Sequence, residues 1–211
     1  MKHFVILTRC RTGSNLLLRC LNQNPGVHCA GELLSPKGDP YSKQEGFPFL
    51  GRAAATGFKL FYCHNRYPGI VEQLEMDSEL YIVHLRRERI LEAVLSRHLA
   101  HQTDKWTDRP YGDVKLTLDI KDVICCFKKN LERWRTARSR FNTQHWFEVT
   151  YETLVSDVKG ACNGIFSFLG VGPWEVSKTM RKQAGKEPKD YIENYDELIE
   201  SLEKAGFAPY L

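Results

Sequence analysis

The chain has 211 residues, 42% of them hydrophobic, which is enough to bury a sizeable core and fits a single domain over residues 1–211. Its formal charge of +4, from 30 basic and 26 acidic residues, lacks the strong basic bias of a nucleic-acid-binding protein and suits a small phosphorylated ligand. The chain has no apolar run near the ~20 residues that span a bilayer, no signal-peptide pattern at its start, and seven cysteines without a Cys-x-x-Cys pair, so the sequence predicts a cytoplasmic protein without a metal site.

Short apolar runs alternate with helical patterns along the chain. Strands are predicted over residues 3–8, 57–62, 80–85 and 145–150. Helices are predicted over residues 16–21, 70–76, 89–101, 120–141, 151–168 and 190–204, the last capped by Gly206. Residues 25–55 are rich in Gly and Pro and indicate a long excursion. The alternation predicts an α/β fold with a central, mainly parallel sheet flanked by helices, whose ligands bind beyond the carboxyl ends of the strands.

The loop after the first predicted strand, Arg11-Thr12-Gly13-Ser14-Asn15, gathers groups that bind an oxyanion. It offers backbone N–H groups at a helix start, two hydroxyls and a guanidinium, and its glycine lets the backbone approach an anion closely. It lacks the Gly-Lys-Ser or Gly-Lys-Thr of a Walker A loop, so an ATP or GTP enzyme is less favoured. The alternative is an ordinary helix start with surface arginines.

A second candidate anion site follows the third predicted strand. Arg86 and Arg87 stand at its carboxyl end, and Ser96 lies nine residues after Arg87 in the next predicted helix. Arginine and serine can bind one anion if that helix packs beside the strand end. The alternative is a basic helix start whose glutamates pair at i,i+4 spacing.

The first of these segments carries a resemblance to a known family. Residues 11–17 resemble the 5′-phosphosulfate loop of the sulfotransferases that use 3′-phosphoadenosine-5′-phosphosulfate (PAPS), with Cys10 at the usual Pro and Asn15 at the usual Thr. The Asn-Pro turn that leads to Gly31-Glu32 resembles the tyrosylprotein and carbohydrate branches of that family.

Three later segments extend the resemblance. The Arg and Ser pair resembles the family's 3′-phosphate element, where Arg87 is the favoured ligand and Arg86 the alternative, although the interval in the best-known branches is one residue shorter. The segment that contains Tyr151 resembles a Tyr-Glu-x-Leu that follows a later strand in many sulfotransferases. The segment that contains Arg181 and Lys182 resembles the basic carboxyl-terminal segment of the bacterial members.

The resemblance implies a P-loop-NTPase-like sulfotransferase fold and transfer of a sulfuryl group from PAPS to an acceptor hydroxyl, with 3′,5′-ADP as product and no metal. It implies Arg11 as the partner of the leaving oxygen, Glu32 as the base, His64 as the alternative base, and Lys59 as a ligand of the sulfonate. The implied nucleotide ligands are Arg11, Thr12, Gly13, Ser14, Asn15, Arg86 or Arg87, Ser96, Tyr151, Arg181 and Lys182.

The acceptor and two rival classes stay open. Residues 30–55 and 103–118 match no family pattern and are expected to form the acceptor pocket, so a carbohydrate, a lipid-linked glycan, a small metabolite and a peptide tyrosine are all compatible. A P-loop kinase with a degenerate loop would need ATP and Mg²⁺. A non-catalytic nucleotide-binding module would bind 3′,5′-ADP and never consume PAPS.

Overall fold

The computed structural model describes residues 1–34, 53–64, 68–106, 111–178 and 187–211. The chain divides into two compact units, each with its own hydrophobic core. The first comprises Met1–Arg87 and Ala137–Thr179, and the second comprises Glu88–Thr136 and Met180–Leu211. A single domain over the whole chain stays a prediction.

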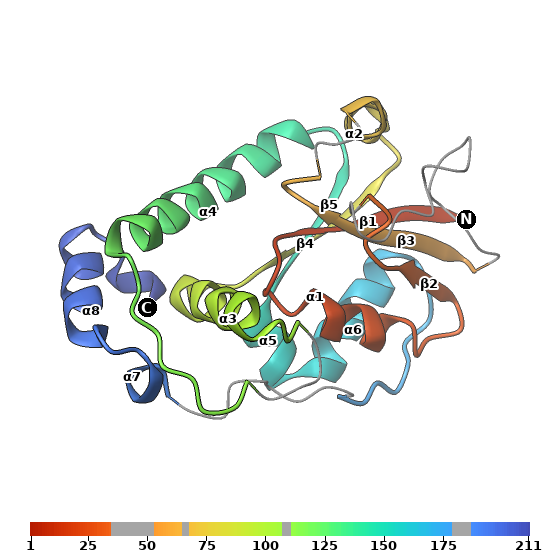
Figure 1. Cartoon of the computed structure of the whole chain (residues 1–211). Helices are drawn as coiled ribbons and strands as arrows, with labels where there is room; N and C mark the ends of the chain where they lie inside the picture. The colour runs from red at the N-terminus through yellow and green to blue at the C-terminus, as the bar shows by residue number, and fades with distance from the viewer. Residues whose placement is uncertain (35–52, 65–67, 107–110, 179–186) are drawn as a thin grey trace. The chain divides into compact units, whose positions relative to one another are not determined.

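The first unit is built around a parallel sheet of five strands in the order β2-β3-β1-β4-β5 (Figure 1). The strands are β1 (Lys2–Thr8), β2 (Val27–Ala30), β3 (Ala55–Phe61), β4 (Tyr81–Arg86) and β5 (His145–Thr150). The central strand β1 pairs with β3 on one side and with β4 on the other. Every residue of β3 is buried, as expected for a parallel strand covered on both faces.

Helices cover both faces of this sheet, with α1 and α6 on one face and α2 on the other (Figure 1). The helices of the unit are α1 (Ser14–Leu21), α2 (Pro68–Met76), α5 (Tyr151–Ser156) and α6 (Val158–Phe168). The core on the α2 face joins side chains of the three middle strands to α2 and to the end of α4, and includes Val5, Leu7, Phe58, Leu60, Leu74, Ile82 and Phe141.

The second unit is helical in its described part. It contains α3 (Ile90–Thr103), most of α4 (Ile120–Arg140), α7 (Pro188–Tyr191), α8 (Tyr195–Lys204) and a 3-10 helix (Ala208–Tyr210). Its core draws on all the longer helices and includes Leu95, Leu99, Phe127, Leu198, Leu202 and Phe207. In the described ranges, no helix is both long and apolar enough to cross a bilayer.

The predicted fold class and all four predicted strands are confirmed, and one strand was missed. Residues 27–30, expected to belong to an excursion, form the edge strand β2. The Asn22 side chain holds this strand, because its amide accepts from the Cys29 N–H at 2.7 Å and donates to the Cys29 carbonyl at 2.8 Å. Two hydrogen bonds from one side chain leave no periodic pattern in the sequence, so the sequence did not predict this strand.

Two predicted helices are each divided in the structure. The helix expected over 151–168 breaks at Asp157, whose carboxylate accepts from the Gly160 N–H at 2.8 Å and caps α6. The helix expected over 190–204 is preceded by the short α7 and begins at Tyr195. The predicted cap of the last helix is confirmed, since Gly206 has a φ of 82° and the Phe207 N–H bonds to the Leu202 carbonyl.

Close approach of β1 and β3 requires glycine at position 57. A Cβ at Gly57 would lie 2.4 Å from the Phe4 carbonyl oxygen, which is shorter than any real contact. We expect Gly57→Ala to lower the free energy of unfolding by about 1–3 kcal/mol, measured by urea denaturation, since the strands must move apart. At Gly172 an added Cβ meets nothing within 4 Å, so Gly172→Ala should be stable to within about 0.5 kcal/mol. Equal stability of the two variants would contradict this reading of the sheet.

Candidate functional site

The loop between β1 and α1 contains two residues with left-handed backbone conformation. Arg11 has a φ of 68° and Gly13 has a φ of 87°. Glycine adopts this conformation freely, whereas a residue with a side chain is strained by roughly 1–2 kcal/mol. The guanidinium of Arg87 donates from Nη1 to the Arg11 carbonyl at 3.1 Å. Arg87 therefore fixes the peptide that follows the strained residue.

Tyr151, the first residue of α5, packs against the same loop. A Cβ at Gly13 would lie 2.4 Å from Cδ2 of the Tyr151 ring, so glycine is required here by contact as well as by φ. The Arg87 guanidinium also lies over the Tyr151 ring, with its Cζ 4.3 Å from the ring centroid. The loop and the carboxyl ends of β4 and β5 thus meet in one place, and Arg87 of the second expected anion element lies beside the first.

Hydroxyl groups hold the base of the loop. The Thr12 hydroxyl lies 2.6 Å from the Thr8 hydroxyl and 2.8 Å from the Arg9 carbonyl, and either of these oxygens can accept its single proton. Thr8 in turn donates to the Leu85 carbonyl of β4 at 2.7 Å. The Thr12 hydroxyl is therefore engaged inside the protein, and the predicted role of Thr12 in anion binding would fall to its backbone N–H. Ser14 is buried and opens α1, where the first N–H groups of the helix have no intrahelical acceptor.

A buried ammonium group joins three elements beside the loop. Lys59 of β3 donates from Nζ to Asn15 Oδ1 of α1 at 2.5 Å and to Glu32 Oε1 at 2.9 Å. The Lys59 side chain is 5% exposed and that of Glu32 is 34% exposed. A buried cation needs such partners, because desolvation without them is costly.

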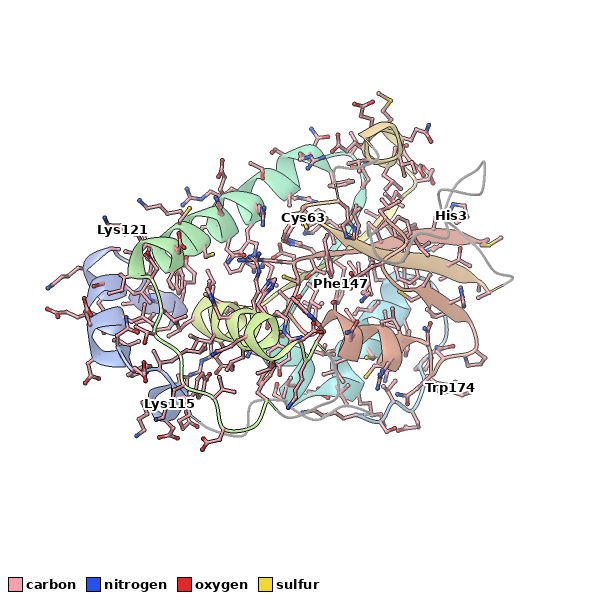
Figure 2. All side chains as sticks on the ribbon, in the orientation of Figure 1. His3, Cys63, Lys115, Lys121, Phe147 and Trp174 are labelled. Carbon is pink, nitrogen blue, oxygen red and sulfur yellow. The ribbon has the colours of Figure 1, made fainter. Side chains whose placement is uncertain are left out.

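His64 belongs to the same cluster. Burial lowers its pKa below 6.5, while the nearby charges of Glu32 and Lys59 act in opposite directions on it. The Phe61 N–H donates to His64 Nδ1 at 3.2 Å. Because Nδ1 accepts this bond, the neutral ring carries its proton on Nε2. The structure therefore brings together Glu32, Lys59 and His64, whose roles were expected from resemblance alone. Cys63, labelled in Figure 2, lies in the turn just after β3 from which His64 projects.

Some sequence-predicted site residues are not placed with these groups. Ser96 lies in the second unit, where its hydroxyl is 3.0 Å from the Tyr111 hydroxyl. Arg181 and Lys182 lie outside the described residues. Arg86 donates to Glu148 at 3.2 Å. The nucleotide roles of these four residues stay predictions, and the contact of Arg87 with the loop favours it over Arg86.

Sequence reasoning missed a chain of hydrogen bonds on the other face of the sheet. The Tyr62 hydroxyl is 2.5 Å from His84 Nε2, and His84 Nδ1 is 3.0 Å from Glu148 Oε1. Burial lowers the pKa of His84 below 6.5. Partial burial works to raise the pKa of Glu148, but the bond to His84 and the charge of Arg86 outweigh it and lower that pKa. The only sequence signal is a histidine inside an apolar strand.

The lowered pKa of His84 makes stability depend on pH. As pH falls below about 6.5, the unfolded chain gains a proton on this side chain that the native chain resists, so stability present above that pH is lost. We expect the free energy of unfolding to fall by up to about 1.4 kcal/mol per pH unit for this proton, and His84→Gln to reduce that slope. Urea denaturation across this range measures it. The pKa of His64 is also lowered, so His64 contributes to the pH dependence of stability in the same direction, and it is still present in the His84→Gln variant as an internal reference. A slope unchanged in His84→Gln would contradict the assignment.

Comparison with known proteins finds a match to one family over part of the chain. The model of the sulfotransferase family matches residues 74–175, which include β4, α3, α4, β5 and Tyr151. No curated protein matches the chain by sequence.

Solved structures share the fold over nearly the whole chain. A sulfotransferase from Alicyclobacillus acidocaldarius is 15% identical with a TM-score of 0.60, over 100% of this chain and 92% of that one. Mouse sulfotransferase SULT7A1, complexed with PAP, is 13% identical with a TM-score of 0.51, over 99% and 88%. The sulfotransferase domain from the curacin biosynthetic pathway is 14% identical with a TM-score of 0.52, over 90% and 82%. The chain therefore matches the sulfotransferase family over residues 74–175, and its fold is the one that these solved sulfotransferases share.

Proposed function

We propose that this enzyme transfers the sulfuryl group of PAPS to a hydroxyl group of its acceptor and releases 3′,5′-ADP. The hydrogen bond between Arg87 and the Arg11 carbonyl carries the proposal. It joins the ends of two neighbouring strands, β1 and β4, each with a guanidinium suited to one phosphate of the same nucleotide. The mouse structure in complex with PAP supports a donor of this class.

The nucleotide would be held mainly by the first unit. The start of α1 presents the N–H groups of Gly13, Ser14 and Asn15, together with the positive end of the helix dipole, to the 5′-phosphate. Arg87, positioned by the Tyr151 ring, would bind the 3′-phosphate. Ser96, Arg181 and Lys182 stay candidate 3′-phosphate ligands on the family resemblance alone.

The reaction is an in-line displacement at sulfur. The acceptor oxygen forms a new bond to sulfur while the bond from sulfur to the 5′-phosphate oxygen breaks, and the acceptor proton passes to a base. The Arg11 guanidinium would stabilise the charge that develops on the leaving phosphate oxygen. The Lys59 ammonium would hold the sulfuryl oxygens, because it is fixed beside the start of α1.

The geometry supports Glu32 as the base. Its carboxylate is partly exposed and is held by Lys59 through Oε1, so Oε2 would be the oxygen that accepts the proton. His64 receives the Phe61 N–H on Nδ1, so its neutral ring offers only a donor at Nε2. His64 would therefore act as a hydrogen-bond donor beside the base.

The base assignment predicts different losses in two variants. Glu32→Gln should lower turnover of PAPS by about 10²- to 10⁴-fold, because the amide keeps the shape of the carboxylate but accepts no proton. Its affinity for 3′,5′-ADP should stay within about threefold of wild type, which calorimetry measures and which confirms folding. His64→Gln serves as the comparison and should lose less turnover. Normal turnover in Glu32→Gln with the larger loss in His64→Gln would assign the base to His64 instead.

The donor assignment predicts selective stabilisation by one nucleotide. 3′,5′-ADP should raise the melting temperature of the protein, since a ligand that binds only the native state stabilises it, whereas ATP with Mg²⁺ should not. Arg11→Ala and Arg87→Ala should each reduce that shift, and Arg11→Ala should also abolish PAPS turnover. A larger shift with ATP and Mg²⁺ would favour a kinase. Binding of 3′,5′-ADP without any consumption of PAPS would indicate a non-catalytic module.

A further inference from the structure

The Lys59 ammonium is held from two sides by oxygen atoms that belong to different elements. One is Asn15 Oδ1 in the first turn of α1, at 2.5 Å, and the other is Glu32 Oε1 after β2, at 2.9 Å. The Lys59 side chain is 5% exposed, so its stem is confined by packing. An ammonium group has three N–H donors in tetrahedral arrangement. Once two of them are fixed, the direction of the third is fixed as well.

The contact with Asn15 depends on the residue type at this position. An ammonium group donates and never accepts, so the amide atom that faces it is the oxygen. In the sulfotransferase loop that this segment resembles, the position is Thr. A threonine hydroxyl is attached to Cβ, one bond nearer the backbone than an asparagine amide oxygen. On the same helix backbone it would fall short of Lys59.

We propose that Asn15 is a positioning residue for sulfuryl transfer, which aims the third N–H of Lys59 at the sulfuryl group of the donor. The inference rests on the proposed function, because it takes PAPS as the donor. Without the Asn15 oxygen, only Glu32 of these two partners still holds the ammonium. The ammonium is then drawn toward that carboxylate, away from the sulfuryl oxygens. Asn15 thereby acts through Lys59, and loss of its side chain lowers the affinity for a ligand that carries the sulfuryl group.

This role separates two nucleotides that differ in that group alone. PAPS carries the sulfuryl group that Lys59 would contact, and 3′,5′-ADP lacks it. If Asn15 acts through Lys59, removal of the Asn15 side-chain oxygen lowers the affinity for PAPS and leaves the affinity for 3′,5′-ADP unchanged. If the Asn15 side chain instead binds the 5′-phosphate directly, its removal lowers the affinity for both nucleotides equally.

Calorimetry of the full chain with PAPS and with 3′,5′-ADP, in the absence of any acceptor, tests the proposal. We expect Asn15→Ala and Asn15→Thr each to weaken PAPS binding by about 10- to 100-fold, the range for a lost hydrogen bond to a charged group. Their affinity for 3′,5′-ADP should stay within about threefold of wild type, which also shows that the variants fold. Arg19→Lys, on the exposed side of the same helix, is the matched control and should change neither affinity.

A double-mutant cycle shows whether Asn15 works through Lys59. In a Lys59→Met background, adding Asn15→Ala should cause no further loss of PAPS affinity, because the group that Asn15 positions is gone. Additive losses in this cycle, or equal weakening of PAPS and 3′,5′-ADP by Asn15→Ala, would overturn the proposal while leaving the proposed function intact. A wild-type protein that binds neither nucleotide would instead refute the proposed function.

Discussion

The site depends on a backbone that turns through left-handed conformation directly after β1. Gly13 can adopt this conformation without strain, and no larger residue fits because the Tyr151 ring occupies the space of a Cβ. Arg11 adopts it at a cost, which the hydrogen bond from Arg87 helps to offset. The turn is therefore stable only where β1 and β4 are neighbours and β5 leads straight into α5. Sheet order, and not loop sequence alone, shapes the loop that we propose to bind the 5′-phosphate.

The same dependence on backbone sets the chemistry of the side chains nearby. Burial lowers the pKa of His64 and so favours its neutral form, in which the Phe61 N–H decides which ring nitrogen carries the proton. A histidine held in this way offers a donor at the site, whereas the partly exposed carboxylate of Glu32 offers an acceptor. Two residue types that can both act as bases in solution thus receive different roles from the turn that follows β3.

Local pattern predicted much of this arrangement, and pairing between distant segments accounts for what it missed. The strand, loop and helix at residues 3–21 were predicted because each has its own periodicity or turn residues. The convergence of Glu32, Lys59 and His64 was expected only through resemblance, since nothing in their spacing requires it. The edge strand β2 and the pairing of His84 with Glu148 depend on register between strands, which no short window of sequence contains.

The end of β3 is held from both faces of the sheet, which explains how a short turn can keep a buried histidine in one orientation. Side chains alternate along a strand, so Lys59 and Tyr62, three residues apart, lie on opposite faces. Lys59 bonds to α1 and to Glu32 on one face. Tyr62 packs against the core on the other face and bonds to His84, which is itself held by Glu148. The backbone between them can tilt toward neither face without breaking a buried polar contact, and His64 follows that backbone directly.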